Sequence, residues 1–145
     1  MAGWKIRNAA GTGIIDVDGI KLSGGTLVTA TAAELNAYSI LTYIADANTA
    51  GSAFVIAPHA GNIIGLFAVN SVANTTTKTV LLAKIATVTV TAPAWEIAVT
   101  QAAGVASSVV PTAANAVAAA AVIEIAFDGG GAPVMPVQIT ILISR

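Results

Sequence analysis

The sequence predicts an all-β domain, an antiparallel sandwich or barrel, preceded by an extended N-terminal arm with one short helix. Three observations lead to this prediction. Residues 38–145 contain many short runs rich in Val, Ile, Thr and aromatic residues, turn-forming sequences separate the runs, and several runs alternate apolar with polar residues. That alternation is typical of strands with one buried face. Many short, regularly spaced strands favour a sandwich or barrel over alternating strands and helices.

Residues 1–37 are predicted to form the arm. Six glycines fall within residues 3–25, and the apolar pieces between them, such as Ile14-Ile15, are short. A segment of this kind cannot build its own core and orders best against a partner. The sequence Thr31-Ala32-Ala33-Glu34 matches a capping box, in which Thr31 and Glu34 each bond a backbone amide of the other. It predicts a helix of one to three turns that ends near Ala37.

The predicted strands fill residues 38–145, which we expect to be one domain. They are residues 38–45, 53–57, 62–70, 78–85, 87–91, 95–100, 122–127 and 137–143. In residues 87–91 valine alternates with threonine, which predicts one apolar and one hydroxylated face. The alanine-rich residues 113–121 are compatible with a short helix. Pro111 and Asn115 favour instead a loop that leads into the strand at residues 122–127.

Charged residues are scarce in this chain. Only 9% of its 145 residues are Asp, Glu, Lys or Arg, against about 25% in an average protein. The net charge of −1 gives no basic surface for nucleic acid. The 56% hydrophobic content and mean hydropathy of +0.84 suggest a membrane protein, but Pro, Asn, Gln or Ser interrupts each long uncharged stretch, so no membrane span is expected. No apolar region follows Lys5 and Arg7, so no signal peptide is expected either. Two interpretations of the surface are open: neutral Thr, Ser, Asn and Ala keep it hydrated, or other subunits cover much of it, and we favour the second.

Candidate catalytic or ligand-binding groups are few and isolated. There is no cysteine, and the single histidine, His59, lies in a predicted turn, so neither a metal cluster nor a catalytic triad is expected. Asp16-Val17-Asp18-Gly19 resembles part of a calcium loop, but Leu27 stands where the bidentate Glu belongs. Glu96 and Glu124 could form a glycosidase pair, yet strand alternation places each opposite its apolar neighbours, toward solvent. We expect no enzymatic activity and no cofactor.

The two tryptophans are the largest potential anchors. Trp95 lies in a predicted strand and is expected in or near the core. Trp4 stands beside Ile6 in the arm, and two interpretations are open for it. It is either an interface anchor, as buried aromatics often are, or part of a flap that folds onto its own domain.

Two stretches of the chain resemble tailed-bacteriophage virion proteins. Residues 25–36 read GTLVTATAAELN and are similar to the TATAAELN segment that recurs in phage decoration and fibre proteins. From about Ala57 to Arg145, the order of several pieces resembles small head-decoration (cement) proteins with a jelly-roll-like β-sandwich. These pieces are residues 60–63, 111–115, 122–125, 128–131 and 136–141. The chain departs from that pattern at Ala120-Ala121, where a polar turn is expected, and at Phe127, where a small polar residue is usual.

The resemblance implies a virion protein on the capsid exterior. It would decorate and stabilise the head by bridging major capsid protein subunits as an oligomer, with a homotrimer expected, and bind neither nucleic acid nor membrane. The resemblance also implies that the arm contacts the capsid. The candidate contact residues are Trp4, Lys5, Ile6, Arg7, Ile14 and Ile15. Two alternatives remain: a phage fibre, spike or receptor-binding module that recognises host carbohydrate, and a major shell or tail-tube subunit.

Overall fold

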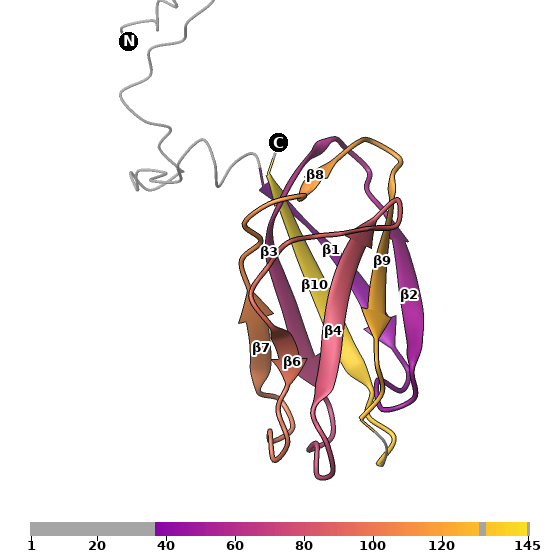
Figure 1. Cartoon of the computed structure of the whole chain (residues 1–145), viewed down its shortest axis with the longest axis vertical. Coiled ribbons are helices and arrows are strands. Elements are labelled where there is room, and N and C mark those ends of the chain that lie inside the picture. The colour runs from indigo at the N-terminus through magenta and orange to yellow at the C-terminus, as the bar shows by residue number, and fades with distance from the viewer. Residues whose placement is uncertain (1–36, 131–132, 145) are drawn as a thin grey trace, which may run out of the picture. The chain divides into compact units, whose positions relative to one another are not determined.

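The computed structural model describes residues 37–130 and 133–144, which form two antiparallel β-sheets and contain no helix (Figure 1). The prediction of an all-β fold is therefore confirmed. The ten strands are β1 (Ala37–Ile44), β2 (Gly51–Ile56), β3 (Gly61–Asn70), β4 (Thr79–Ile85), β5 (Val88–Thr89), β6 (Trp95–Ile97), β7 (Ala106–Val109), β8 (Ala116–Val117), β9 (Val122–Phe127) and β10 (Val137–Ser144).

The strands divide between the sheets without following chain order. The first sheet has the order β1-β10-β3-β7, with β8 also paired to β3. The second sheet has the order β2-β9-β4-β5, with β6 also paired to β4. In Figure 1 the second sheet faces the viewer and β10 passes behind β4. Strands β1 and β2 are thus edge strands of their respective sheets, with β7 and β5 at the opposite edges.

The core lies between the two sheets. In β10 the residues Val137, Ile139, Ile141 and Ile143 are completely buried and alternate with residues that point outward. Ile123 and Ile125 of β9 do the same from the second sheet, and Trp95 is 3% exposed, as its sequence position predicts. Each fully buried aliphatic side chain of this size contributes about 1.5–3 kcal/mol through the hydrophobic effect. The alternation of β9 and β10 thus fixes which face of each sheet is inside.

A bulge in β3 sets the outer surface of the first sheet. The pairing of β3 with β10 shifts by one residue, so that Ile143 pairs with Ile63 while Leu142 pairs with Gly65. Ile64, the residue in the bulge, is directed outward and is 37% exposed. The ring of Phe67 lies against Gly65, where a Cβ atom would be 2.8 Å from the ring. Two large apolar side chains of β3 therefore lie on the outside.

The structure corrects three sequence predictions. The predicted strand at residues 87–91 is wrong, because only Val88–Thr89 is a strand and the alternation fails: Val88 is 58% exposed, whereas Val90 is buried and donates its backbone N–H to Ala83. The short strands β7 and β8 were not predicted. Ala37, the expected end of the helix, is the first residue of β1. The rest of that helix and of the arm lie outside the described residues.

The alanine-rich residues 113–121 were predicted to be a loop, and the structure agrees. They contain only the two-residue strand β8 and lead directly into β9. Ala114 and Ala120 both have a positive φ, of 51° and 61°. Ala120 is one of the positions where the chain departs from the resemblance, and a glycine would accommodate this backbone conformation better.

Candidate functional site

Strands β1 and β2 each carry two highly exposed large apolar side chains. Among the exposed Leu, Ile, Phe and Tyr residues, the four most exposed are Leu41 (61%) and Tyr43 (60%) of β1, with Phe54 (64%) and Ile56 (64%) of β2. Neither strand contains a charged residue or a proline. Soluble proteins usually protect the outer strands of a sheet with such residues, because an open strand edge invites pairing with another chain. Strands β1 and β2 lack both of these protective features.

The outer surface of the first sheet carries no formal charge. We call this surface the charge-free face and define it by the outward side chains of β1, β10, β3 and β7. One row across the sheet, in strand register, is Leu41, Thr140, Phe67 and Ser108, and the next is Tyr43, Gln138, Val69 and Ala106. No Asp, Glu, Lys or Arg occurs in these strands or in β8. The charge-free face is therefore apolar, with neutral hydrogen-bonding groups between the apolar side chains.

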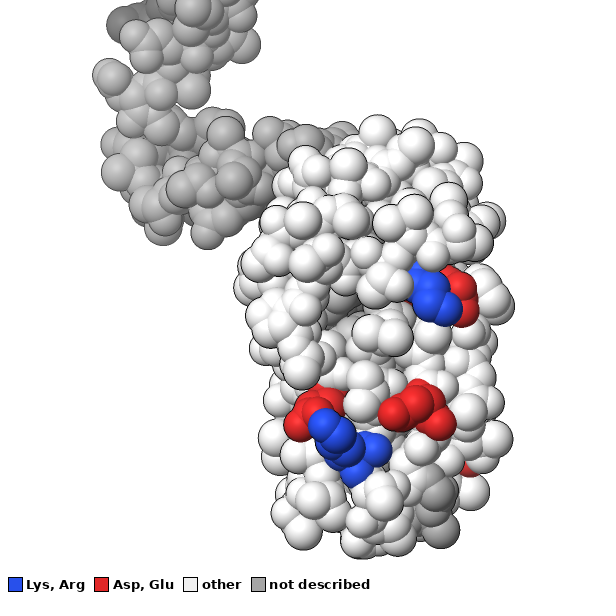
Figure 2. Space-filling model, in the orientation of Figure 1, with Lys and Arg blue, Asp and Glu red and all other residues white. Residues whose placement is uncertain are grey.

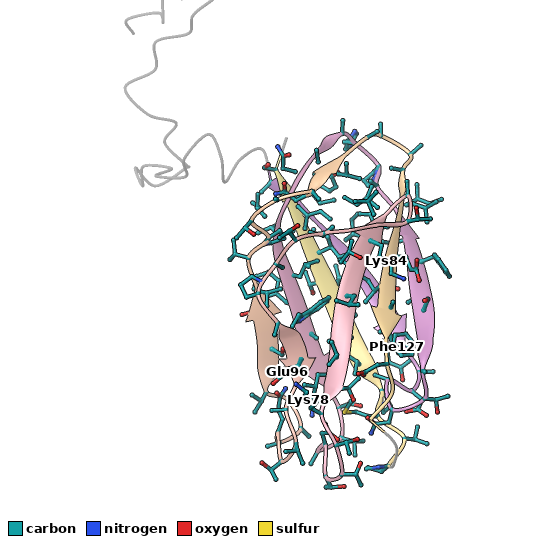
Figure 3. All side chains as sticks on the ribbon, viewed as in Figure 1. Lys78, Lys84, Glu96 and Phe127 are labelled. Carbon is teal, nitrogen blue, oxygen red and sulfur yellow. The ribbon has the colours of Figure 1, made fainter. Side chains whose placement is uncertain are left out.

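The charged side chains of the described residues lie elsewhere. Lys84 and Glu124 form an ion pair at 3.3 Å on the outer surface of the second sheet, and Lys78 and Glu96 form a second pair at 2.8 Å. Figure 2 shows charged groups of both signs on this side of the domain. Figure 3 labels three of these residues and shows that Lys78 lies beside Glu96 at one end of the sheet and Lys84 toward the other. Exposed ion pairs of this kind contribute little to stability. They keep this surface suited to water.

The ionisation of two of these groups is displaced by their partners. The pKa of Glu124 is lowered, mainly because the Ser52 hydroxyl donates a 2.6 Å hydrogen bond to its carboxylate, with Lys84 adding to the effect. The pKa of Lys78 is raised by its hydrogen bond to Glu96 and by the charge of that carboxylate. Both shifts favour the ionised forms, so the ion pairs persist at neutral pH.

The two glutamates considered as a glycosidase pair are not brought together. Both lie on the outer surface of the second sheet, as strand alternation predicts. In register, Glu96 is opposite Val80 of β4, whereas Glu124 is opposite Lys84. Four residues along a strand correspond to about 13 Å. That separation exceeds the roughly 5–10 Å at which two carboxyl groups act on one glycosidic bond.

Three buried asparagines tie together the loops at one end of the domain, a feature that sequence reasoning missed. Asn48 accepts a hydrogen bond from the Thr79 hydroxyl and donates one to the Pro133 carbonyl. Asn70 and Asn74 donate to several backbone carbonyls of neighbouring loops, including those of Val72, Ala102, Thr77 and Ile97. Buried amides with this many partners rigidify the loops that they connect. Their role here is structural.

A shallow depression of about 440 Å³ lies where β1 connects to β2. Its lining includes Tyr43, Asp46, Thr49, Ser52 and the ring of Phe127, which packs over Gly51. The Asp46 carboxylate accepts hydrogen bonds from the backbone N–H groups of Met135 and Asn48 and from the Thr49 hydroxyl, and these bonds lower its pKa. Asp46 is therefore already engaged in holding the loops. The depression offers an exposed aromatic ring and a few polar groups.

The candidate residues from the sequence fall into two groups. Trp4, Lys5, Ile6, Arg7, Ile14 and Ile15 all lie outside the described residues, as does the Asp16–Asp18 motif. His59 is exposed in the turn before β3, where its backbone carbonyl accepts a 2.6 Å hydrogen bond from the Tyr38 hydroxyl and its ring meets the Tyr38 ring edge-on. Across residues 37–130 and 133–144 no three His, Cys, Asp or Glu side chains are grouped to hold a metal ion.

Two further findings complete the description of the surface. In the part of the chain that the structure describes, no helix is long and apolar enough to cross a membrane. No protein-family model, curated protein or solved structure matches the chain.

Proposed function

We propose that this protein is a structural virion subunit that decorates the exterior of a phage capsid. As an oligomer, with a trimer expected, it would bridge neighbouring major capsid protein subunits and stabilise the head. The observation that carries the proposal is the absence of charge from β1, β2 and the charge-free face, combined with about 60% exposure of Leu41, Tyr43, Phe54 and Ile56. Interfaces that are permanently occupied are depleted in charge and rich in apolar and aromatic area.

We also propose that the fold is a jelly-roll-like sandwich. The strand order supports this assignment: β1, β10 and β3 are neighbours in one sheet, whereas β2, β9 and β4 are neighbours in the other. Successive strands β1, β2, β3 and β4 thus alternate between the sheets, and the last two strands return between the first four. Two intertwined Greek keys produce this arrangement in jelly rolls.

The mechanism rests on multivalency and mass action. A single decoration subunit binds weakly, but an oligomer whose copies engage several capsid subunits at once gains affinity without any new contact. Because only the assembled shell presents the complete site, binding shifts the equilibrium toward the assembled head. In this proposal the arm residues Trp4, Lys5, Ile6, Arg7, Ile14 and Ile15 contact the capsid, and the two-sheet domain provides the contacts between copies.

A pelleting assay with expanded, undecorated heads tests the proposal. The full chain is mixed with heads, the heads are sedimented, and the bound protein is quantified. We expect saturable binding and heads that resist heat or chelator better when decorated. A variant that lacks residues 1–10 should bind at least ~10-fold more weakly, since it loses one of several linked contacts. Its circular dichroism spectrum should stay that of the intact β domain, and global unfolding would contradict the assignment of these residues to an arm.

The second candidate function is recognition of host carbohydrate by a fibre or spike module. The depression beside Tyr43 favours it, because sugar sites combine an exposed aromatic ring with polar side chains such as Thr49 and Ser52. Two results together would favour this function over decoration. The wild-type chain would bind a glycan on an array but not bind heads, and Tyr43→Ala would abolish the glycan binding.

A further inference from the structure

We propose that the charge-free face packs against a second copy of this chain. This inference deepens the proposed function, on which it rests for the expectation of an oligomer, by naming the surface that joins the copies. Because the same face is used on both copies, the contact is two-fold, and the inference predicts a dimer where the resemblance implies a trimer. It assigns the contact to the outer side of the first sheet and not to the outer side of the second.

The composition of the face decides what can cover it. Each row across the sheet contains a large apolar side chain, Leu41 and Phe67 in one row and Tyr43 with Val69 in the next, between neutral groups such as Thr140. A partner that presents charged side chains here would leave them desolvated with no counter-ion, which is strongly unfavourable. The covering surface must therefore be uncharged as well. This chain itself presents such a surface, and two copies of it meet without charge repulsion.

The size of the face is adequate for such a contact. Strands β1 and β10 each contain 8 residues. Strand β3 contains 10 residues and β7 only 4. At the normal rise and spacing, these four strands make a surface of roughly 450 Å² in projection. Side chains that stand out from the sheet increase the accessible area beyond the projection. A stable interface buries about 800 Å² on each partner, so a contact that uses the whole face and its rim approaches that requirement.

The outer side of the second sheet is less suited to the same contact. It also carries exposed apolar groups, including Phe54 and Leu82, but the Lys84–Glu124 pair lies among them. The Lys78–Glu96 pair lies on the same side, and Figure 2 shows charged groups of both signs there. Burying the ion pairs in an interface would remove water from both partners of each pair, a penalty that the attraction between them often fails to offset. We therefore assign the contact between copies to the first sheet.

Two matched double variants of the full-length chain test the assignment. Leu41→Lys with Tyr43→Lys places two charges on the charge-free face. Phe54→Lys with Ile56→Lys places two charges on β2. This strand is also at the edge of a sheet, and the two side chains are about as exposed as Leu41 and Tyr43, but β2 belongs to the second sheet. Both variants should fold, because each replaces side chains that are about 60% exposed or more. Circular dichroism and thermal unfolding verify this before the assembly is measured.

Sedimentation velocity and light scattering at tens of micromolar then give the oligomeric state. We expect the wild type and Phe54→Lys/Ile56→Lys to be oligomers. Leu41→Lys/Tyr43→Lys should be a monomer, with a dissociation constant at least ~100-fold higher, because like charges then meet across the contact. We call Leu41→Lys/Tyr43→Lys the β1 variant and Phe54→Lys/Ile56→Lys the β2 variant. A monomeric wild type would overturn the proposal. So would a β1 variant that remains an oligomer, whether or not the β2 variant dissociates.

Head binding distinguishes this inference from the proposed function. If the wild type binds heads but the β1 variant remains an oligomer, decoration stands and the charge-free face is the wrong surface. If the β1 variant dissociates as expected but the wild type ignores heads, the contact between copies stands and decoration is the wrong function.

Discussion

Gly61 lies so close to the backbone carbonyl of Ser144 that a Cβ atom at position 61 would overlap the oxygen. The approach occurs at the end of β3, where Asn62 pairs with Ser144 and Gly61 pairs with Val117 of β8. Only glycine permits β10 and β8 to be hydrogen-bonded to β3 at this point. One residue type at one position thus determines how the last strand joins the first sheet.

We therefore expect Gly61→Ala to lower the free energy of unfolding by about 3 kcal/mol, the range of substitutions that force a backbone shift. Chemical denaturation monitored by circular dichroism measures the change. Gly104→Ala is the matched control, since its site is open and only its φ of +78° is unfavourable for alanine. It should lower stability by about 1–2 kcal/mol. Equal effects of the two variants would show that the approach to Ser144 is not a constraint.

The hairpin between β4 and β5 offers a stabilising substitution. Its two turn residues, Ala86 and Thr87, have φ values of 46° and 76°, as in a type I′ turn. A β-branched residue is strained in that conformation, whereas glycine adopts it freely. Thr87→Gly should therefore raise the free energy of unfolding by about 1 kcal/mol. Thr89→Gly, in β5, should lower it instead, and a fall with both variants would contradict the turn geometry.

The acid sensitivity of the domain is expected to depend on Asp46. Hydrogen bonds from the Met135 backbone and the Thr49 hydroxyl hold the pKa of Asp46 below its ordinary value. The pKa of Asp46 is lower in the folded state than in the unfolded state, where it is near 4. The ionised carboxylate therefore contributes its full stabilisation of the fold at pH values above about 4. This contribution is lost as the pH falls through the folded-state pKa. Asp46→Asn should lower the melting temperature by several degrees near neutral pH. The wild-type and variant melting temperatures should converge in the most acidic buffers, and a constant difference across pH would contradict the assignment.

The buried amide of Asn70 is expected to contribute more to the stability of the fold than its small size suggests. Asn70 is completely buried and donates to the carbonyls of Val72 and Ala102, while Gln101 donates to its side-chain oxygen. Asn70→Ala leaves these groups without partners, so stability should fall by about 2–3 kcal/mol. Asn62→Ala, at an exposed position of the same strand, should change it by no more than about 0.5 kcal/mol. Thermal unfolding of the two variants compares them directly.

The sequence predicted those elements whose pattern is local. Residues 122–127 were predicted as a strand and form β9 with the same bounds, because the run is rich in β-branched and aromatic residues and the turn-forming Asp128-Gly129 follows it. Strand β7 (Ala-Ser-Ser-Val) was missed, since these residues have little intrinsic strand preference and form a strand by pairing with β3. The contact between Asn48 and Thr79 joins positions 31 residues apart, which no local pattern reveals.

The charge-free face also needed the structure. Strand β1 reads AYSILTYI, which is apolar on both sides, so alternation alone does not show which side faces the core. Pairing with β10 resolves the ambiguity, because it aligns Ile40 with the buried Ile141 and Leu41 with Thr140 on the outside. The scarcity of charge was visible in the sequence. That the charges of residues 37–130 and 133–144 lie on the second sheet and in the loops was not visible there.

Electron microscopy of heads saturated with the full-length protein would show both of its proposed contacts. We expect added density at repeated positions on the outer surface of the shell, with each two-sheet domain in contact with other copies and with more than one capsid subunit. Heads that gain no density at saturating protein, alongside a chain that remains an isolated, fully hydrated monomer, would contradict this expectation.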